Sequence, residues 1–196
     1  MHQTPATIAD QRRDKILDAA MGVFGRFGFQ KTSVQDLADA VSISKPGLYL
    51  HFASKDDIFE AAMERYLTNA LDQLCDELTK PKRSLPDRLV AAMEAWFGRH
   101  LITFTPDAID VIEAGDRLSA DWVADVKNVF RQSVAQAFQT EGYAKGAAYK
   151  RAEMLFLCGL SWKLPGTTPE IFRVRMKACI DVCCGHDAPR QTESLK

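Results

Sequence analysis

The chain has 196 residues, of which 46% are apolar and 26% are charged, as in a globular protein with one ordinary domain or two small ones. Lys and Arg total 25 against 26 Asp and Glu, which excludes a strongly basic or acidic chain. A nucleic-acid partner stays open, because a sequence-specific binder needs only a local basic face. No apolar run approaches the roughly 18 residues of a membrane span, and residues 1–10 lack the apolar core of a signal peptide, so a cytoplasmic location is predicted.

Apolar residues recur at helical spacing almost throughout, and Pro and Gly fall where helices would end, so an all-α fold is predicted. The first helix is expected to begin near Thr7, which forms a capping-box pattern with Asp10, and to end at Gly28. Its apolar face consists of Ile16, Ala20, Val23, Phe24 and Phe27.

A short second helix follows, capped by Thr32 or Ser33, and a third short helix covers residues 45–52. Ser54 and Asp57 form another capping box, which opens a fourth helix that runs to residue 78. Two short helices joined by three or four residues in a three-helix unit are the pattern of a helix-turn-helix, whose second helix enters the major groove of DNA. This pattern alone leaves open an ordinary helical hairpin.

A loop over residues 80–86 separates these helices from a second series. Helical spacing and breaks at Pro and Gly predict further helices over residues 85–104, 108–118, 119–142, 147–164 and 168–184. The chain is therefore expected to have about nine helices in total, followed by a polar tail.

The stretch from Ile16 to Phe59 resembles the N-terminal domain of the TetR family of transcriptional regulators. The resemblance runs through Ile16-Leu17-Asp18-Ala19-Ala20, Val23-Phe24, Phe27-Gly28, Lys31-Thr32-Ser33-Val34, Asp36-Leu37-Ala38, Ser44, Gly47-Leu48-Tyr49, His51-Phe52, Ser54-Lys55 and Ile58. It implies a helix-turn-helix DNA-binding domain over residues 1–53. It also implies a helical bundle over residues 54–186 for dimerisation and effector binding, with residues 187–196 as the tail.

The resemblance further implies a repressor that binds a pseudo-palindromic DNA operator as a homodimer and is released by a small, largely apolar effector. The DNA contacts that it implies are Thr32, Ser33, Gln35, Ser44, Lys45, Pro46, Gly47, Tyr49, His51 and Lys55. Their chemistry fits, since Lys45 can donate to guanine and Tyr49 to phosphate. The family usually has Gly where this chain has Ser42, so a left-handed turn there would cost about 1 kcal/mol.

The helices after residue 85 are rich in aromatic residues and Met, which could line an apolar effector pocket or simply form a core. The candidate pocket residues are Trp96, His100, Phe104, Trp122, Phe130, Met154 and Trp162. By resemblance, the last two long helices form the dimer interface. The apolar residues expected there are Leu157, Leu160, Ile171, Met176, Ile180 and Val182.

Cys179, Cys183, Cys184 and His186 invite a metal-binding or redox interpretation, but no second ligand pair completes a zinc pattern. The alternative is that the cysteines are small apolar residues at a helix interface. No nucleophile and base occur in a catalytic spacing and no phosphate loop is present, so neither an enzyme nor a cofactor is predicted. A redox-responsive or metal-responsive regulator and a helical interaction module without DNA binding stay open as alternatives.

Overall fold

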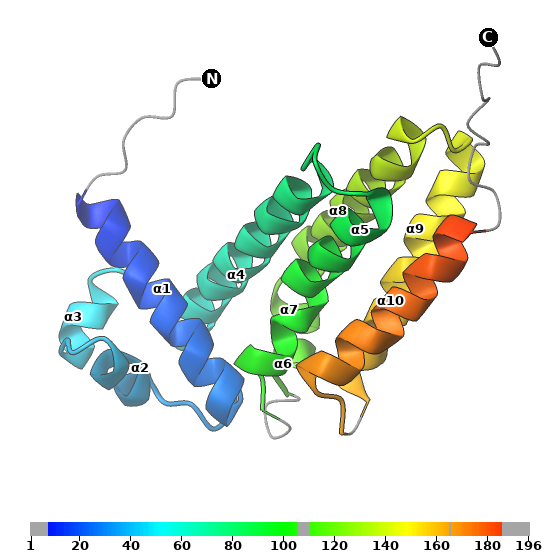
Figure 1. The fold of residues 1–196 in the computed structure, drawn as a ribbon. Coiled ribbons are helices and arrows are strands. Elements are labelled where there is room, and N and C mark those ends of the chain that lie inside the picture. The colour runs from blue at the N-terminus through cyan, green and yellow to red at the C-terminus, as the bar shows by residue number, and fades with distance from the viewer. Residues whose placement is uncertain (1–7, 106–109, 165, 186–196) are drawn as a thin grey trace, which may run out of the picture. The chain divides into compact units, whose positions relative to one another are not determined.

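The computed structural model describes residues 8–105, 110–164 and 166–185. Every regular element in these ranges is a helix, which confirms the all-α prediction (Figure 1). None of the described helices combines the length and the apolarity that crossing a membrane requires. The chain packs as two compact units, one formed by residues up to 69 together with residues 102–124, the other by residues 70–101 and those from 125 onward.

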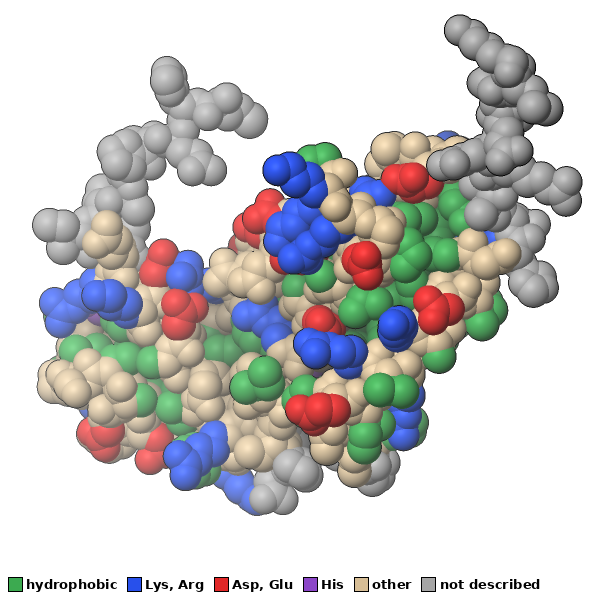
Figure 2. Space-filling model, in the orientation of Figure 1, with side chains coloured by type: hydrophobic (Ala, Val, Ile, Leu, Met, Phe, Trp, Pro, Cys, Tyr) green, Lys and Arg blue, Asp and Glu red, His purple; other side chains and the backbone are tan. Residues whose placement is uncertain are grey.

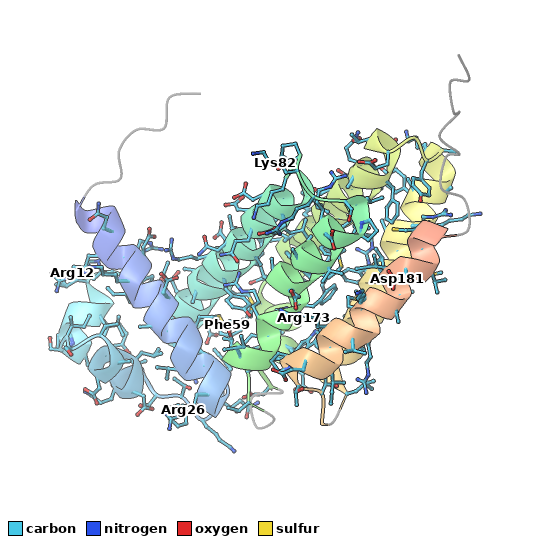
Figure 3. All side chains as sticks on the ribbon, in the orientation of Figure 1. Arg12, Arg26, Phe59, Lys82, Arg173 and Asp181 are labelled. Carbon is cyan, nitrogen blue, oxygen red and sulfur yellow. The ribbon has the colours of Figure 1, made fainter. Side chains whose placement is uncertain are left out.

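The first unit holds the predicted helix-turn-helix. Its elements are α1 (Ile8–Phe27), α2 (Val34–Ala40), α3 (Lys45–Tyr49), the first part of α4 (Lys55–Leu78), the end of α6 (His100–Thr103), α7 (Asp110–Leu118) and the start of α8 (Ala120–Thr140). Phe24, Phe29 and Phe59 form its aromatic centre, with ring centroids 4.8 to 5.8 Å apart. Phe59 is fully buried and points from α4 toward this centre (Figure 3).

The second unit is a bundle with an aromatic core. Besides the remainder of α4 and α8, it contains α5 (Leu85–Met93), a π-helical turn (Glu94–Gly98), α9 (Lys145–Gly159), a 3₁₀ turn (Leu160–Lys163) and α10 (Pro169–Gly185). In Figure 1, α10 lies beside α5 and α9, and the same pairs are in contact. The ring of Phe97 packs against the rings of Trp96, Phe130, Phe156 and Phe172.

Most helix boundaries agree with the sequence, and the exceptions have local causes. The predicted third helix ends at Tyr49 instead of residue 52, because the amide of His51 bonds to the carbonyl of Leu48 in a tighter turn. The predicted helix over residues 85–104 is interrupted by the π-helical turn, and both Trp96 and Phe97 in that turn are buried. The expectations for Thr7, for the residues before Asp110, for Pro165 and for the tail from His186 fall outside the described residues.

The apolar face predicted for α1 is partly wrong. Ile16, Ala20 and Phe24 are buried, but the side chain of Phe27 is 46% exposed and lies under the guanidinium of Arg26. Two residues that were not predicted complete the buried face, namely Leu17 and Met21. Gly28 ends the helix with φ of +86°, as expected for a residue in the left-handed region.

Ser42 ends α2 in a left-handed conformation, with φ of 54°. The amide of Ser42 donates to the carbonyl of Asp39. The chain therefore makes the tight turn although serine, unlike glycine, carries a Cβ. A non-glycine residue in this region is strained by about 1 kcal/mol. The left-handed turn expected at this position is therefore present, with serine in place of glycine.

We expect Ser42→Gly to raise the free energy of unfolding by about 0.5–1 kcal/mol, because glycine removes the strain at a small entropic cost. Chemical denaturation followed by circular dichroism measures the change. Ser42→Ala is the matched control, since alanine keeps the Cβ and no gain is expected. Equal stability of the two variants would show that the turn stores no strain.

Candidate nucleic-acid interface

The start of α2 is fixed by a capping box at Ser33, one of the two residues that the sequence offers as its cap. The Ser33 hydroxyl accepts a hydrogen bond from the amide of Asp36 at 3.2 Å, and the Asp36 carboxylate accepts one from the Ser33 amide at 2.8 Å. Hydrogen bonds from the side chain and the backbone of Ser33 lower the pKa of Asp36. Ser33 itself is exposed, so it stands at the surface beside the positive end of a helix.

Helix α3 is short, and its first turn accounts for the Ser-Lys-Pro-Gly sequence. Ser44 is the N-cap, and its hydroxyl accepts a hydrogen bond from the amide of Gly47 at 3.1 Å. Pro46 lies in the first turn, where an amide hydrogen would have no helical partner. A Cβ on Gly47 would lie 3.2 Å from the Ser44 hydroxyl, so glycine also leaves room for the cap.

One side of α3 packs into the core and the other side faces the surface. Leu48 is fully buried and Phe52 is 2% exposed, so both belong to the core. Lys45 and Pro46 are exposed, and the side chain of Tyr49 is 45% exposed. Leu50, which the sequence analysis did not select, is 86% exposed at the end of the helix. An apolar side chain so placed can contact the methyl group or sugar edge of a nucleotide.

A basic face links α3 to the start of α1. Arg13 donates from Nη1 to the carbonyl of His51 at 3.2 Å, and its guanidinium lies 4.5 Å from the centre of the Phe52 ring. Arg12 is also exposed on α1, and Figure 2 shows Lys and Arg side chains gathered beside α1 and α3. Sequence reasoning missed both arginines, although two adjacent basic residues at the start of a helix were a usable signal.

Besides the capping residues Ser33 and Ser44, three more of the predicted DNA contacts have partners inside the protein. Thr32 is 2% exposed, and its hydroxyl donates to the carbonyl of Gly28 at 2.6 Å. The ammonium of Lys55 donates to the carbonyls of Phe29 and Thr32 at 3.0 and 3.1 Å, which uses two of its three hydrogens. Gln35 is exposed, and its amide donates to Asp39 at 2.7 Å. Lys55 therefore ties the start of α4 to the turn before α2.

The same turn is held from the other side by α7. The carboxylate of Asp110 accepts hydrogen bonds from the amides of Phe29 and Gln30, at 3.1 and 2.7 Å. The carbonyl of Gly25 accepts a bond from the amide of Thr105 at 2.9 Å. The helix-turn-helix is thus anchored at the end of α1 by a segment about 80 residues later in the sequence, which fixes the position of α2.

The predicted pocket residues are divided between the two units. Phe104 and Trp122 belong to the first unit, where Phe104 packs on Tyr66, and the remaining five belong to the second. Trp96 and Phe130 pack within the aromatic core, and His100 stacks on Trp162 with ring centroids 4.7 Å apart. Met154 is 47% exposed on α9. A common effector pocket of these residues stays a prediction.

The cysteines show no sign of a metal site. Among the described residues, no three His, Cys, Asp or Glu side chains group in a way that could hold a metal ion. Burial, followed by a hydrogen bond with Cys179, raises the pKa of Cys158 to about 12. Burial likewise raises the pKa of Cys184 to about 11. Since the thiolate is the reactive form, these shifts support the apolar interpretation of the cysteines.

The fold and this surface define a helix-turn-helix protein: a capped recognition helix, an exposed lysine and tyrosine on it, and a basic face beside it. Residues 16–62 match the family described as bacterial regulatory proteins, tetR family. The similarity to this family therefore covers the helix-turn-helix and the start of α4.

Known transcriptional regulators are similar to part of this chain. The transcriptional activator FasR of Mycolicibacterium smegmatis is 36% identical over 91 residues, which cover 45% of this chain and 40% of FasR. The repressor KstR2 of the same organism is 34% identical over 100 residues, 50% of this chain and 48% of KstR2. The matched segment thus spans less than half of either relative. A transcriptional regulator from Rhodococcus sp. Rha1 shares the fold, with a TM-score of 0.69 at 18% identity, over 87% of this chain and 95% of its own.

Proposed function

We propose that the chain is a sequence-specific DNA-binding repressor that binds a pseudo-palindromic operator as a homodimer and is released by a small, largely apolar effector. The observation that carries DNA binding is the Ser44-capped helix α3, which exposes Lys45 and Tyr49 while Leu48 fixes it to the core. In a homodimer, two such helices would enter successive major grooves roughly 34–36 Å apart. The site of action would be the chromosome, in the cytoplasm.

Each exposed group has a role that follows from its chemistry. Lys45, in the first turn of α3, would donate to guanine O6 or N7 in the groove. The hydroxyl of Tyr49, with Arg13 and the exposed end of α2 at Ser33, would bind phosphates and set the register. Lys55 would act chiefly by holding the turn before α2 in place, because its ammonium already has two carbonyl partners.

Dimerisation would use the exposed apolar residues of α9 and α10. Leu157 is 58% exposed, Ile171 40%, Val174 70% and Val182 64%. Two other residues expected at the interface, Met176 and Ile180, are at most 1% exposed and belong to the core, so that expectation was wrong. Exposed apolar residues on two neighbouring helices suit a four-helix contact between two copies.

The relatives include both an activator and a repressor, so similarity does not set the direction of regulation. Repression follows where the operator overlaps a promoter, since a bound dimer then excludes the polymerase. Release by an effector would require the effector to bind the DNA-free conformation more tightly than the bound one. The continuous helix α4, which runs from Lys55 to Leu78, would transmit the conformational change from the effector to the helix-turn-helix.

Electrophoretic mobility shift against the DNA upstream of the chain's own gene tests DNA binding. We expect Lys45→Ala and Tyr49→Ala each to weaken binding by about 10-fold, because each removes one direct contact worth about 1–2 kcal/mol. Binding should also fall steeply with salt as counterions are released. Lys82→Ala is the matched control, since this exposed lysine lies in the α4–α5 turn. Wild-type affinity in both α3 variants would refute the proposed contacts.

A further inference from the structure

A groove with a volume of about 940 Å³ opens in the second unit, between the α4–α5 turn and the ends of α8 and α9. This volume is typical of sites for small organic molecules. The lining mixes apolar side chains, such as Leu78 and Leu85, with hydroxyl and amide groups, such as Ser133 and Gln136. None of the predicted pocket residues lines it. Figure 2 shows Lys and Arg side chains gathered over the adjoining turn, where Figure 3 labels Lys82.

Arg88 is the unusual member of this lining, because it is a charged side chain in a buried position. The residue is 8% exposed, and its Nη1 donates to the carbonyl of Leu78 at 2.8 Å. Its Nη2 forms an ion pair with Glu141, whose side chain is 43% exposed. The Nε atom is buried and has no hydrogen-bond partner. Such an unpaired buried donor costs about 1–3 kcal/mol, so it calls for an explanation.

The geometry of the guanidinium suggests the missing partner. Nε and Nη2 form one edge of the group, and this edge can donate two parallel hydrogen bonds to a single carboxylate. Glu141 takes only Nη2 and leaves Nε without an acceptor. Because the side chain of Glu141 is 43% exposed, its carboxylate can turn toward water when a ligand takes its place. A ligand carboxylate in its place would satisfy both donors.

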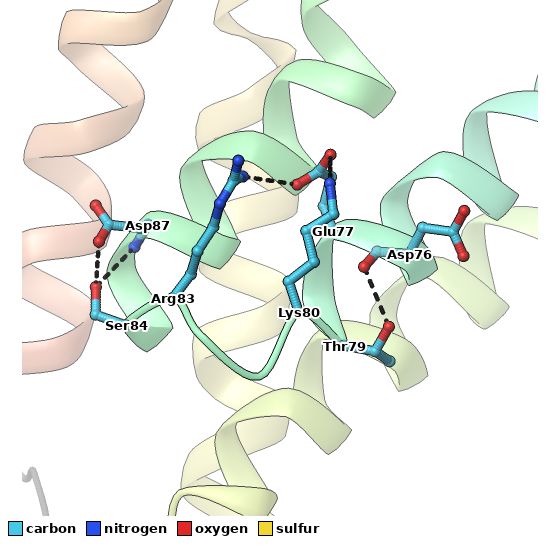
Figure 4. A network of polar contacts seen from close by, with 7 residues as sticks. All are labelled: Asp76, Glu77, Thr79, Lys80, Arg83, Ser84 and Asp87. Carbon is cyan, nitrogen blue, oxygen red and sulfur yellow. Dashed lines mark hydrogen bonds and ion pairs between the residues drawn. The ribbon is translucent and has the colours of Figure 1, made fainter.

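The entrance to the groove is already ordered. In the α4–α5 turn, Glu77 pairs with Lys80 and with Arg83, and Ser84 caps α5 through the amide of Asp87 (Figure 4). The charged residues of the lining are Arg83, Arg88 and Glu141, so the lining carries a net charge of +1 from two positive groups and one negative group. The excess of positive groups in the lining favours an anion over a neutral molecule, and the preformed rim lowers the cost of ordering on binding.

We propose that this groove binds a small organic molecule with a carboxylate on an apolar body, and that the carboxylate replaces Glu141 at the Nε–Nη2 edge of Arg88. The apolar body would lie along Leu78, Leu85 and Ala137, and the hydroxyl and amide groups of the lining would leave room for polar substituents. A role for this ligand as the effector rests on the proposed function, whereas its binding does not.

Isothermal titration calorimetry on the full chain without DNA tests the site. The probes are hexanoate, octanoate and decanoate, each compared with the alcohol of the same length. We expect at least one carboxylate to bind with a dissociation constant below about 1 mM, and its alcohol to bind about 10-fold more weakly or worse, because the alcohol cannot take both donors. If none of the carboxylates binds in this range, or if carboxylate and alcohol bind alike, the proposal is overturned.

Variants of the lining separate the site from a general effect on folding. Arg88→Lys keeps the charge but loses the two-bond edge, and Gln136→Trp fills the groove from an exposed position of α8, so each should weaken carboxylate binding about 10-fold. Glu141→Gln removes the competing charge and should tighten binding. Asn128→Trp, exposed on the same helix outside the groove, is the matched control and should bind as the wild type does. Unchanged binding in Gln136→Trp would place the ligand elsewhere and refute the site.

Mobility shift with the bound carboxylate then tests the effector role. Release of the operator by the carboxylate in the wild type, but not in Gln136→Trp, would support it. Unchanged operator affinity at saturating carboxylate would exclude that role and leave the binding site established by calorimetry. A chain that failed to bind DNA would instead refute the proposed function, without any effect on the calorimetric result.

Discussion

Gly159→Ala is expected to lower the free energy of unfolding of the second unit by about 1–3 kcal/mol. A Cβ at this position would lie 2.1 Å from the ring of Phe97, a distance at which the two groups cannot coexist. The ring cannot yield cheaply, because Phe97 is 2% exposed and packs against four other aromatic rings. Urea denaturation followed by tryptophan fluorescence measures the loss.

Gly146→Ala provides the matched control on the same helix. No atom lies within 4 Å of a Cβ at Gly146, so this variant should gain about 0.5–1 kcal/mol from better helix formation. Combining Gly159→Ala with Phe97→Leu should recover part of the lost stability, because the smaller side chain makes room. Wild-type stability of Gly159→Ala alone would show that the aromatic core is looser than the structure indicates.

Acidification is expected to destabilise the second unit through His100. Burial, assisted by the positive charges of Arg99 and Lys163, lowers the pKa of His100 to about 3. The unfolded chain therefore binds one more proton than the folded chain between pH 6.5 and pH 3. The neutral imidazole contributes its full stability above pH 6.5 and loses it as the pH falls, by about 2–3 kcal/mol at pH 4.5.

His100→Phe isolates this contribution, because phenylalanine can keep the stacking on Trp162 and does not titrate. The free energy of unfolding of each protein is measured between pH 7 and pH 4.5. All other titrating groups are the same in the two proteins, so their contributions cancel in the difference. The free energy of unfolding of the wild type minus that of the variant reports on His100 alone. This difference should fall by about 2–3 kcal/mol between pH 7 and pH 4.5. Parallel curves would mean that His100 is protonated at no cost in the folded state.

Local signals in the sequence predicted those parts of the interface that depend on near neighbours. The cap at Ser33 and the helix stop at Gly28 follow from residues within four positions along the chain. The Ser54–Asp57 pattern was right in kind, since Ser54 caps α4 through the amide of Asp57. The Asp57 carboxylate, however, accepts from the amide of Ala53 instead of Ser54, a detail of backbone direction that spacing does not reveal.

Contacts between distant segments escaped prediction for a physical reason. Whether Lys55 faces solvent or the carbonyls of Phe29 and Thr32 depends on how α4 packs against the turn before α2. In the same way, Phe104 and Trp122 share the apolar character of the core aromatics but lie in the other unit. Composition and spacing select residues by type, whereas membership of a site depends on tertiary packing. Arg88 illustrates this limit, because a charged residue in a helix gives no sign in sequence that it will be buried.

The hydrogen bonds from Phe29 and Gln30 to Asp110 have a consequence for biosynthesis. They join residues 81 and 80 positions apart, so the turn that orients α2 cannot be completed while only the first hundred residues have left the ribosome. Nascent α1 to α3 would have their local caps but not this anchor. Long-range closure of this kind slows folding and delays it toward the end of synthesis. The surface proposed to bind DNA would thus take its final form only after most of the chain has been made.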